Sequence, residues 1–258
     1  MRRYQTIVIA MALDERDVTT LRHAAYFAQA AGSQTVYMAH VTPTFDLPPE
    51  AAVQSPDVVL PIDEDIEHRL RQIYTEQQIE FPPGTRIECA VRQGSMVPEI
   101  VRLAAQKSAD LVCLSRRPHE DHDPLSDSAV KVLRIAPCSS FLIPASVVPR
   151  YDRILVPVDF SEHSREALDV AVAVATSNPG AIITVLHVYE VPIGYYKTGR
   201  TYEEFADIMK NLAERQWDEF LLMVNFRNVP WNIRFELSDK VPKVILAVAN
   251  EIDAQLIV

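Results

Sequence analysis

Glycine is scarce in this chain, which has six glycines in 258 residues and none between Gly94 and Gly180. A loop that wraps phosphate groups needs glycines, because only a bare backbone lets several N–H groups approach the anion closely. A glycine-rich phosphate loop is therefore excluded over that whole stretch.

The chain also has few features of secreted, membrane-spanning or nucleic-acid-binding proteins. Its three cysteines are far apart without metal-ligand spacing, which favours reduced thiols in the core. No apolar run approaches the roughly 18 residues that cross a bilayer. The net charge of −10 argues against a general nucleic-acid binder. We expect a cytoplasmic protein with no membrane or nucleic-acid partner.

The dominant positive feature is an internal duplication. Residues 4–11 resemble residues 151–158, an offset of 151 − 4 = 147, and this offset holds over about forty residues. Farther on, Val97-Pro98 matches Val241-Pro242, where the offset has slipped to 242 − 98 = 144. The sequence therefore predicts two copies of one module, with loops of slightly different length.

Each copy alternates strand-like and helix-like segments. The predicted strands are 5–11, 35–41, 86–92, 110–115 and 139–144 in the first copy, and 153–158, 181–188, 232–237 and 254–258 in the second. The predicted helices are 17–31, 62–79, 97–108 and 128–135, then 163–176, 202–224 and 241–251. Alternation of this kind predicts an α/β fold with right-handed crossovers and parallel sheets.

The duplication predicts a domain at residues 1–146, a proline-bearing linker, and a second domain at 151–258. The last residues of the chain match the fourth strand of the first copy, near Val112. About 144 − 112 = 32 residues of the first copy therefore have no counterpart in the second. We expect the second domain to be truncated before its fifth strand.

The segment 153–164 predicts a strand, a short turn and a helix. Its apolar run ends at Asp159, and Ser161 or Ser164 can cap the helix that follows. In an open parallel sheet, ligands bind outside the carboxyl ends of strands, where Asp159 would lie.

These residues resemble a known family. The run Ile154-Leu155-Val156-Pro157-Val158-Asp159-Phe160-Ser161, the later Leu186-His187-Val188, and Val132-Leu133-Arg134-Ile135-Ala136-Pro137-Cys138 are similar to universal stress protein motifs. The resemblance covers nearly the whole chain as two tandem copies. It implies two tandem three-layer α/β sandwich domains, each with a mostly parallel five-stranded sheet of the adenine nucleotide alpha hydrolase-like type, the second one incomplete.

The resemblance also implies a ligand, because many members of that family bind ATP. Their pattern places an acid at the end of the first strand near the ribose, and a valine at the end of the second strand beside the base. Carried over, Pro157, Val158 and Asp159 match the first-strand element, and Val188 matches the second.

The first copy departs from that pattern. Ala12 takes the position of Asp159, so the ribose acceptor is missing. The family pattern also has a glycine-rich loop after the fourth strand that wraps the phosphates and ends in Gly-Ser or Gly-Thr. Here residues 114–118 contain no glycine, and Ser126-Asp127 stands in place of Gly-Ser. We therefore expect ATP binding in the second domain only, although the second copy lacks its phosphate loop within these 258 residues.

The sequence predicts a regulatory binding protein of the stress response. The alternatives left open are an interaction module without nucleotide and a weak ATP hydrolase. No catalytic base or metal set is identifiable, so an enzyme is not expected. The two copies are expected to pack as an intrachain pseudo-dimer, with a homodimer left open.

Three other features have a functional and a structural interpretation, and the structural one is favoured for each. His40 and His187 repeat at equivalent strand ends, which favours hydrogen bonds within the fold over ligand contact. His163, close to Asp159, fits a helix start better than a catalytic triad. The loop with His119 and His122 could hold zinc or nickel but fits a solvated acidic loop better.

Overall fold

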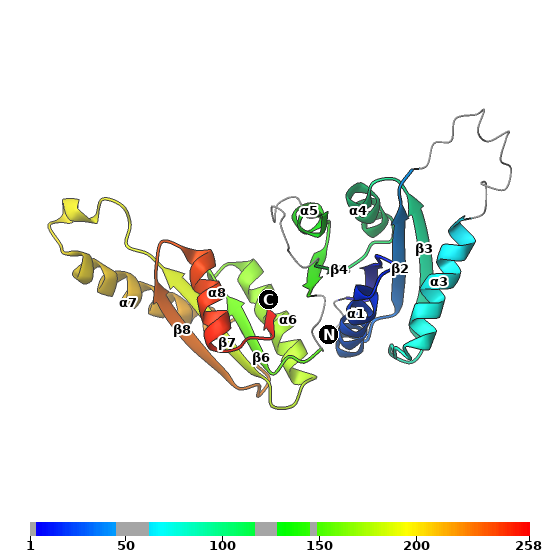
Figure 1. Ribbon diagram of the computed structural model, residues 1–258. Helices are drawn as coiled ribbons and strands as arrows, with labels where there is room; N and C mark the ends of the chain where they lie inside the picture. Colours follow the sequence, from blue (N-terminus) through cyan, green and yellow to red (C-terminus); the bar gives the residue numbers. More distant parts are fainter. Residues whose placement is uncertain (1–3, 45–61, 117–127, 145–148) are drawn as a thin grey trace. The chain divides into compact units, whose positions relative to one another are not determined.

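The computed structural model describes residues 4–44, 62–116, 128–144 and 149–258. It divides into two compact units, Met1–Pro149 and Arg150–Val258 (Figure 1). Each unit is a parallel sheet with helices on both faces, as the alternation of strands and helices predicts.

The first unit has a five-stranded parallel sheet with the strand order β3-β2-β1-β4-β5. The strands are β1 (Thr6–Ala10), β2 (Thr35–Thr42), β3 (Arg86–Gln93), β4 (Leu111–Ser115) and β5 (Ser139–Ile143). The helices are α1 (Arg16–Ala31), α3 (Ile62–Glu76), α4 (Met96–Gln106) and α5 (Ser128–Ile135).

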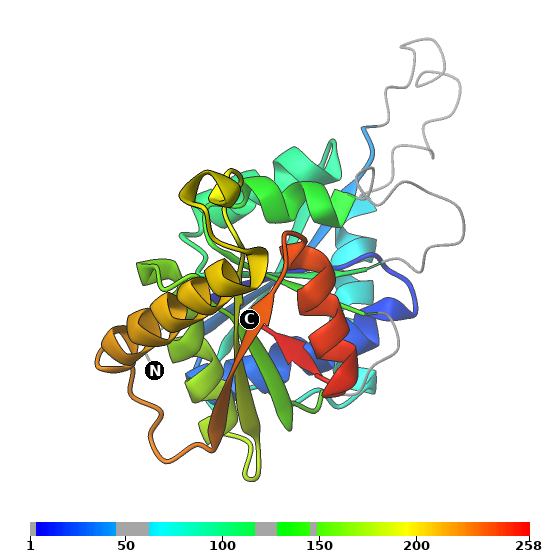
Figure 2. The ribbon, with the colours of Figure 1, turned by 90° about the vertical axis from the view of Figure 1, so that its left-hand side faces the viewer.

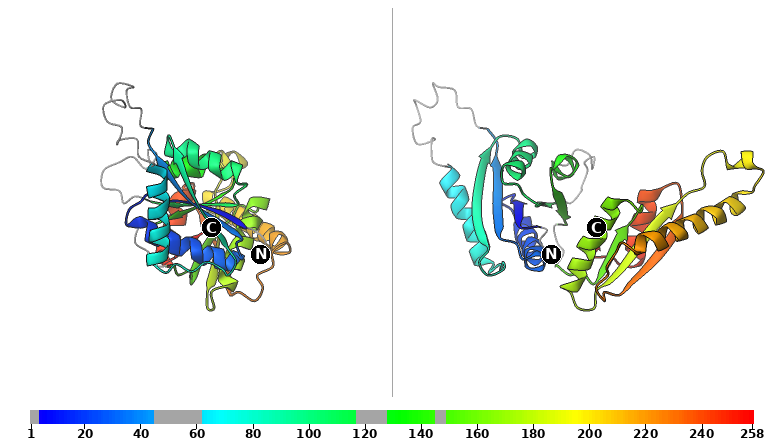
Figure 3. Two further views of the ribbon diagram at one scale, coloured as in Figure 1. Left: turned by 90° about the vertical axis from the view of Figure 1, so that its right-hand side faces the viewer. Right: turned by 180° about the vertical axis from the view of Figure 1, so that it is seen from behind.

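Alternate strand residues of the first unit face two separate helix layers. Val8, Val112 and Leu114 pack with Leu103 of α4 and Val132 of α5. The other face is covered by α1 and α3, so the unit has three layers (Figures 1 and 3). Nearly continuous burial along β1 and β4 is typical of central strands in parallel sheets.

The second unit has a four-stranded parallel sheet with the order β8-β7-β6-β9. The strands are β6 (Arg153–Pro157), β7 (Ile182–Tyr189), β8 (Trp231–Leu237) and β9 (Leu256–Ile257). The helical segments are α6 (Glu162–Thr176), η3 (Tyr195–Thr198), α7 (Tyr202–Leu221) and α8 (Val241–Glu251). Figure 2 shows α8 on the opposite face of this sheet from α6 and α7.

The expectation of a five-stranded sheet in each domain is correct for the first unit, whereas the sheet of the second unit has four strands among the described residues. The order of the second sheet repeats that of the first, and its described residues include no counterpart of β5.

Strand register corrects the late offset of the repeat. Ile7 pairs with Leu111, and the equivalent Ile154 pairs with Leu256. The early offset is thus 154 − 7 = 147, as predicted, but the late one is 256 − 111 = 145 and not 144. Pro98 and Pro242 are therefore not structurally equivalent, although each lies in the first turn of its helix.

An aromatic cluster fills one side of the second unit. Trp217 and Phe220 of α7 are buried, with ring centroids 6.1 Å apart. The Trp217 ring lies 5.5 Å from that of Trp231, which stacks on Phe226 at 4.6 Å. Phe220 also contacts Phe160, at 5.6 Å, and so links α7 to the end of β6.

The burial of the cysteines and the lengths of the helices can be compared with what the composition predicts. Cys113 is buried, Cys89 and Cys138 are half-buried, and all three are free. Within the described parts of the chain, every helix is too short or too polar to span a membrane.

Candidate functional site

The four residues implicated by the resemblance lie on neighbouring strands. Pro157 ends β6, and Val158 follows it as a buried residue whose N–H donates to Leu186 O at 2.8 Å. Asp159 is the next residue and is exposed, and Val188 is half-buried near the end of β7. The structure thus brings the Val158–Asp159 turn beside Val188, at the carboxyl ends of adjacent strands, where α/β folds bind ligands.

Asp159 is held by its own turn and by the first turn of α6. Its Oδ1 accepts from Ser164 Oγ at 2.6 Å and from the Ser161 N–H at 3.0 Å. Ser161 also caps α6, its Oγ accepting from Ser164 N at 3.2 Å. Hydrogen bonds from the hydroxyls of Ser161 and Ser164 lower the pKa of Asp159 to about 2, so its carboxylate is ionised at any physiological pH.

We expect Ser164→Ala to raise the pKa of Asp159 toward its ordinary value of 3.8, because one hydrogen bond to the ionised form is lost. The Asp159 contribution to stability is present above pH 3.8 and is lost as the pH falls through about 2, since the folded-state pKa is the lower one. An NMR titration of the Asp159 carboxyl carbon measures the shift. Ser177→Ala, at the exposed end of α6, is the control that leaves the pKa unchanged.

His187 and Phe160 form the apolar side of this turn. The His187 Nδ1 lies 2.9 Å from Val158 O, and a carbonyl only accepts, so Nδ1 carries a proton. Phe160 stacks on the imidazole with ring centroids 4.2 Å apart. The interpretation of His187 as a structural hydrogen-bonding residue fits this geometry, and so does the same contact of His40 Nδ1 with Met11 O at 2.9 Å.

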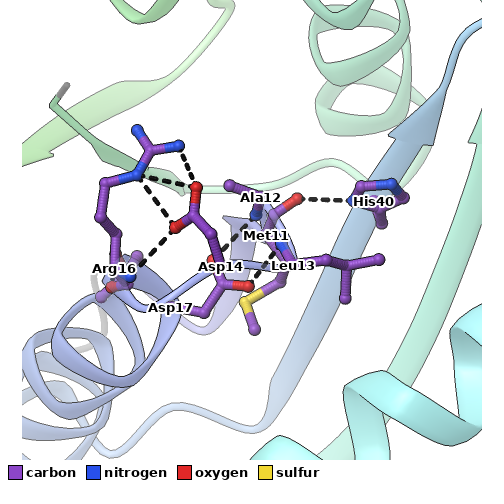
Figure 4. A network of polar contacts seen from close by, with 8 residues as sticks. Met11, Ala12, Leu13, Asp14, Arg16, Asp17 and His40 are labelled. Atoms are coloured by element: carbon purple, nitrogen blue, oxygen red, sulfur yellow. Dashed lines mark hydrogen bonds and ion pairs between the residues drawn. The ribbon is translucent and has the colours of Figure 1, made fainter.

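The corresponding turn of the first unit carries the acid on the helix. Ala12 stands where the second unit has Asp159, and Asp17 of α1 stands where it has Ser164. Figure 4 shows the Asp17 carboxylate turned back onto this turn, with Oδ1 accepting from the Ala12 N–H at 2.8 Å and Oδ2 from the Leu13 N–H at 2.7 Å. Asp17 is completely buried.

The remaining predictions for the first unit are only partly covered by the structure. Arg116 is described, and its N–H donates to Ile143 O at 2.8 Å. The acidic loop with His119 and His122, and Ser126-Asp127, lie outside the described residues. Among the residues that the structure does describe, no group of three His, Cys, Asp or Glu side chains could hold a metal ion.

Sequence reasoning overlooked Asp17. An acid in the first turn of a helix usually faces solvent and favours the helix dipole, which gave no reason to single it out. The repeat contained the signal, because the 147-residue offset sets Asp17 against Ser164 just as it sets Ala12 against Asp159.

Two tandem α/β units with this strand order, and with polar groups at the carboxyl ends of the central strands, define a doubly wound binding fold in duplicate. The model of the Universal stress protein family matches residues 3–144 and 150–258. The chain belongs to the universal stress protein family, with two of its domains in tandem.

Solved structures agree on the fold. A universal stress protein from Archaeoglobus fulgidus DSM 4304 is 16% identical, with a TM-score of 0.62 over 98% of this chain and 83% of that one. A functionally unknown protein from Pseudomonas aeruginosa PAO1 is 14% identical, with a TM-score of 0.61 over 98% and 80%. A universal stress protein in complex with cAMP matches 56% of this chain and 99% of that one, at 17% identity and a TM-score of 0.41. No curated protein matches the chain.

Proposed function

We propose that this protein is a cytoplasmic stress-response regulator whose second domain binds an adenine nucleotide such as ATP, while its first domain does not. In this proposal Asp159 accepts a hydrogen bond from a ribose hydroxyl, Val188 packs beside the base, and Pro157 and Val158 form the strand end beneath them. A regulatory binding role is favoured over catalysis, because no group of three His, Cys, Asp or Glu side chains among the described residues could hold a metal ion.

One observation carries the proposal: Asp159 is exposed, ionised and already oriented. The hydrogen bonds from Ser164 Oγ and the Ser161 N–H both end on Oδ1, and in this proposal Oδ2 accepts from the ribose hydroxyl. A carboxylate fixed before the ligand arrives loses little side-chain entropy on binding. Hydrogen bonds to charged acceptors are also stronger than neutral ones.

Isothermal titration of the whole chain with ATP and with adenosine tests the proposal. We expect one nucleotide per chain, because Ala12 replaces the strand-end acid in the first domain. We also expect similar affinities for the two ligands, because the residues named above contact the nucleoside and not the phosphates. Absence of heat with both ligands, together with no competition against a fluorescent ATP analogue, would reject nucleotide binding.

A second candidate function, docking of another protein, rests on the surface of the second unit. Of thirteen exposed large apolar side chains among the described residues, twelve belong to residues 150–258 and only Ile135 to the first unit. Ile193, Tyr196, Leu222 and Met223 are each more than half exposed. Exposed apolar side chains that lie together can form a contact surface, and Leu222 and Met223 are neighbours in the chain. Size-exclusion chromatography with light scattering tests for a homodimer as the simplest such partner.

A further inference from the structure

The two strand-end turns have the same backbone with different side chains. Leu13 has φ 61° and Phe160, 147 residues later, has φ 65°. Left-handed backbone is uncommon for bulky residues and costs about 1–3 kcal/mol, so each turn must be held by its surroundings. In both units the strand-end N–H donates to the neighbouring strand and a histidine holds the strand-end carbonyl.

The two turns differ in the groups that accept hydrogen bonds from their backbone N–H groups. In the first unit the two oxygens of Asp17 accept from two consecutive N–H groups, those of Ala12 and Leu13. In the second unit Ser164 Oγ accepts from one backbone N–H of the turn, that of Asp159, at 2.9 Å. The Phe160 N–H, the counterpart of that of Leu13, has no acceptor within residues 149–258 or the other described segments.

We infer that Asp17 is an internal ligand of the first domain: its carboxylate occupies the two N–H groups of the strand-end turn, closing that turn to outside ligands. Residue 17 is then a positioning residue. Together with residue 12, it determines whether the N–H groups of the turn are bound by the domain's own carboxylate or remain accessible to a ligand. The first turn also carries the exposed Asp14, which pairs with Arg16. The acid that reaches the turn's N–H groups, however, is the buried Asp17, whereas Asp159 of the second turn is exposed.

The electrostatics of Asp17 agree with this role. Burial raises its pKa, the N–H groups of Ala12 and Leu13 lower it in part, and the nearby Asp14 raises it. Arg16 is turned toward Asp14, whose oxygens accept from its Nε at 2.9 and 3.0 Å (Figure 4). The N–H groups of Ala12 and Leu13 both donate to the Asp17 carboxylate, and a smaller backbone hydrogen bond from Asp14 also lowers its pKa.

Amide hydrogen exchange on the ¹⁵N-labelled whole chain tests the inference, with Phe160 as the internal reference for Leu13. We expect the Leu13 amide to be better protected than that of Phe160. In Asp17→Ser its protection should fall by about tenfold or more, because a buried N–H loses its acceptor. Ala12→Asp with Asp17→Ser should give the first domain the exchange pattern of the second, and this pair serves if the single variant fails to fold.

The reverse pair, Asp159→Ala with Ser164→Asp, should raise the protection of the Phe160 amide by a similar factor. The inference is overturned if Leu13 protection is unchanged in either Asp17→Ser variant while the other amides keep their rates. It is equally overturned if the Phe160 amide is no better protected in Asp159→Ala with Ser164→Asp than in the wild type.

The part of this inference that concerns outside ligands rests on the proposed function. ATP titration of the same samples distinguishes a failure of the proposed function from a failure of the inference about Asp17. If the wild-type chain binds no ATP but protection moves with residue 17, the proposed function fails and the internal ligand stands. If ATP binds to the wild type but protection does not follow the acid, the internal ligand fails and the proposed function stands.

Discussion

Asp159→Ala is expected to weaken ATP binding by about ten- to a hundredfold, because a hydrogen bond to a charged acceptor contributes about 1.5–3 kcal/mol and each 1.4 kcal/mol is tenfold in affinity. The effect should be largely independent of pH between 5 and 8, since the pKa of Asp159 is about 2 and the group stays ionised there. Isothermal titration of wild type and variant measures the ratio of dissociation constants.

Asp169→Ala is the matched control. Asp169 is an exposed acid of α6, the helix that follows Asp159, and pairs with Arg165 at 3.5 Å. Both variants remove one negative charge from the same domain, so a general electrostatic effect on a triphosphate would appear in both. If the two variants bind ATP equally well, Asp159 does not contact the nucleotide.

Phe220→Ala is expected to destabilise the second unit by about 3–5 kcal/mol, the range for removing a buried phenylalanine from a packed core. The ring is 2% exposed and contacts both Trp217 and Phe160. The loss should therefore reach the candidate site as well as the core, because Phe160 follows Asp159 directly. Leu222→Ala, two residues along and 88% exposed, should change stability by less than about 0.5 kcal/mol.

Tryptophan fluorescence during denaturant unfolding reports on this unit alone, because both tryptophans of the chain, Trp217 and Trp231, lie in it. Far-ultraviolet circular dichroism follows both units. In Phe220→Ala we expect the fluorescence midpoint to fall to a lower denaturant concentration. The part of the dichroism transition that comes from the first unit should keep its midpoint. An unchanged fluorescence midpoint would show that the aromatic cluster does not hold the second unit together.

Much of the fold was predictable because hydrophobic periodicity reports burial, and the repeat supplied each pattern twice. Helices α5 and α8 begin and end at the predicted residues, and most strands do so within one or two. The long helix was predicted to run to residue 224 but ends at Leu221. Apolar residues continued past its end, where Leu222 and Met223 are exposed and not packed.

Of the candidate site, the sequence predicts only the residues that lie at the ends of strands. Asp159 could be placed at the mouth of the sheet, because the apolar run before it stops there. The direction in which Asp17 points could not be read from periodicity, since a hydrogen bond to a turn five residues away leaves no regular pattern. The one-residue error in the late offset arose because prolines were aligned, while strand pairing sets the true register.

The inward acid of the first turn has a consequence for how duplicated domains diverge. Two substitutions, at positions 12 and 17, relocate one acidic side chain and leave the number of acidic side chains in the copy as it was. Such a copy keeps its solubility and its architecture while its chemistry is withdrawn, so a tandem protein can become functionally asymmetric through a very small number of genetic events.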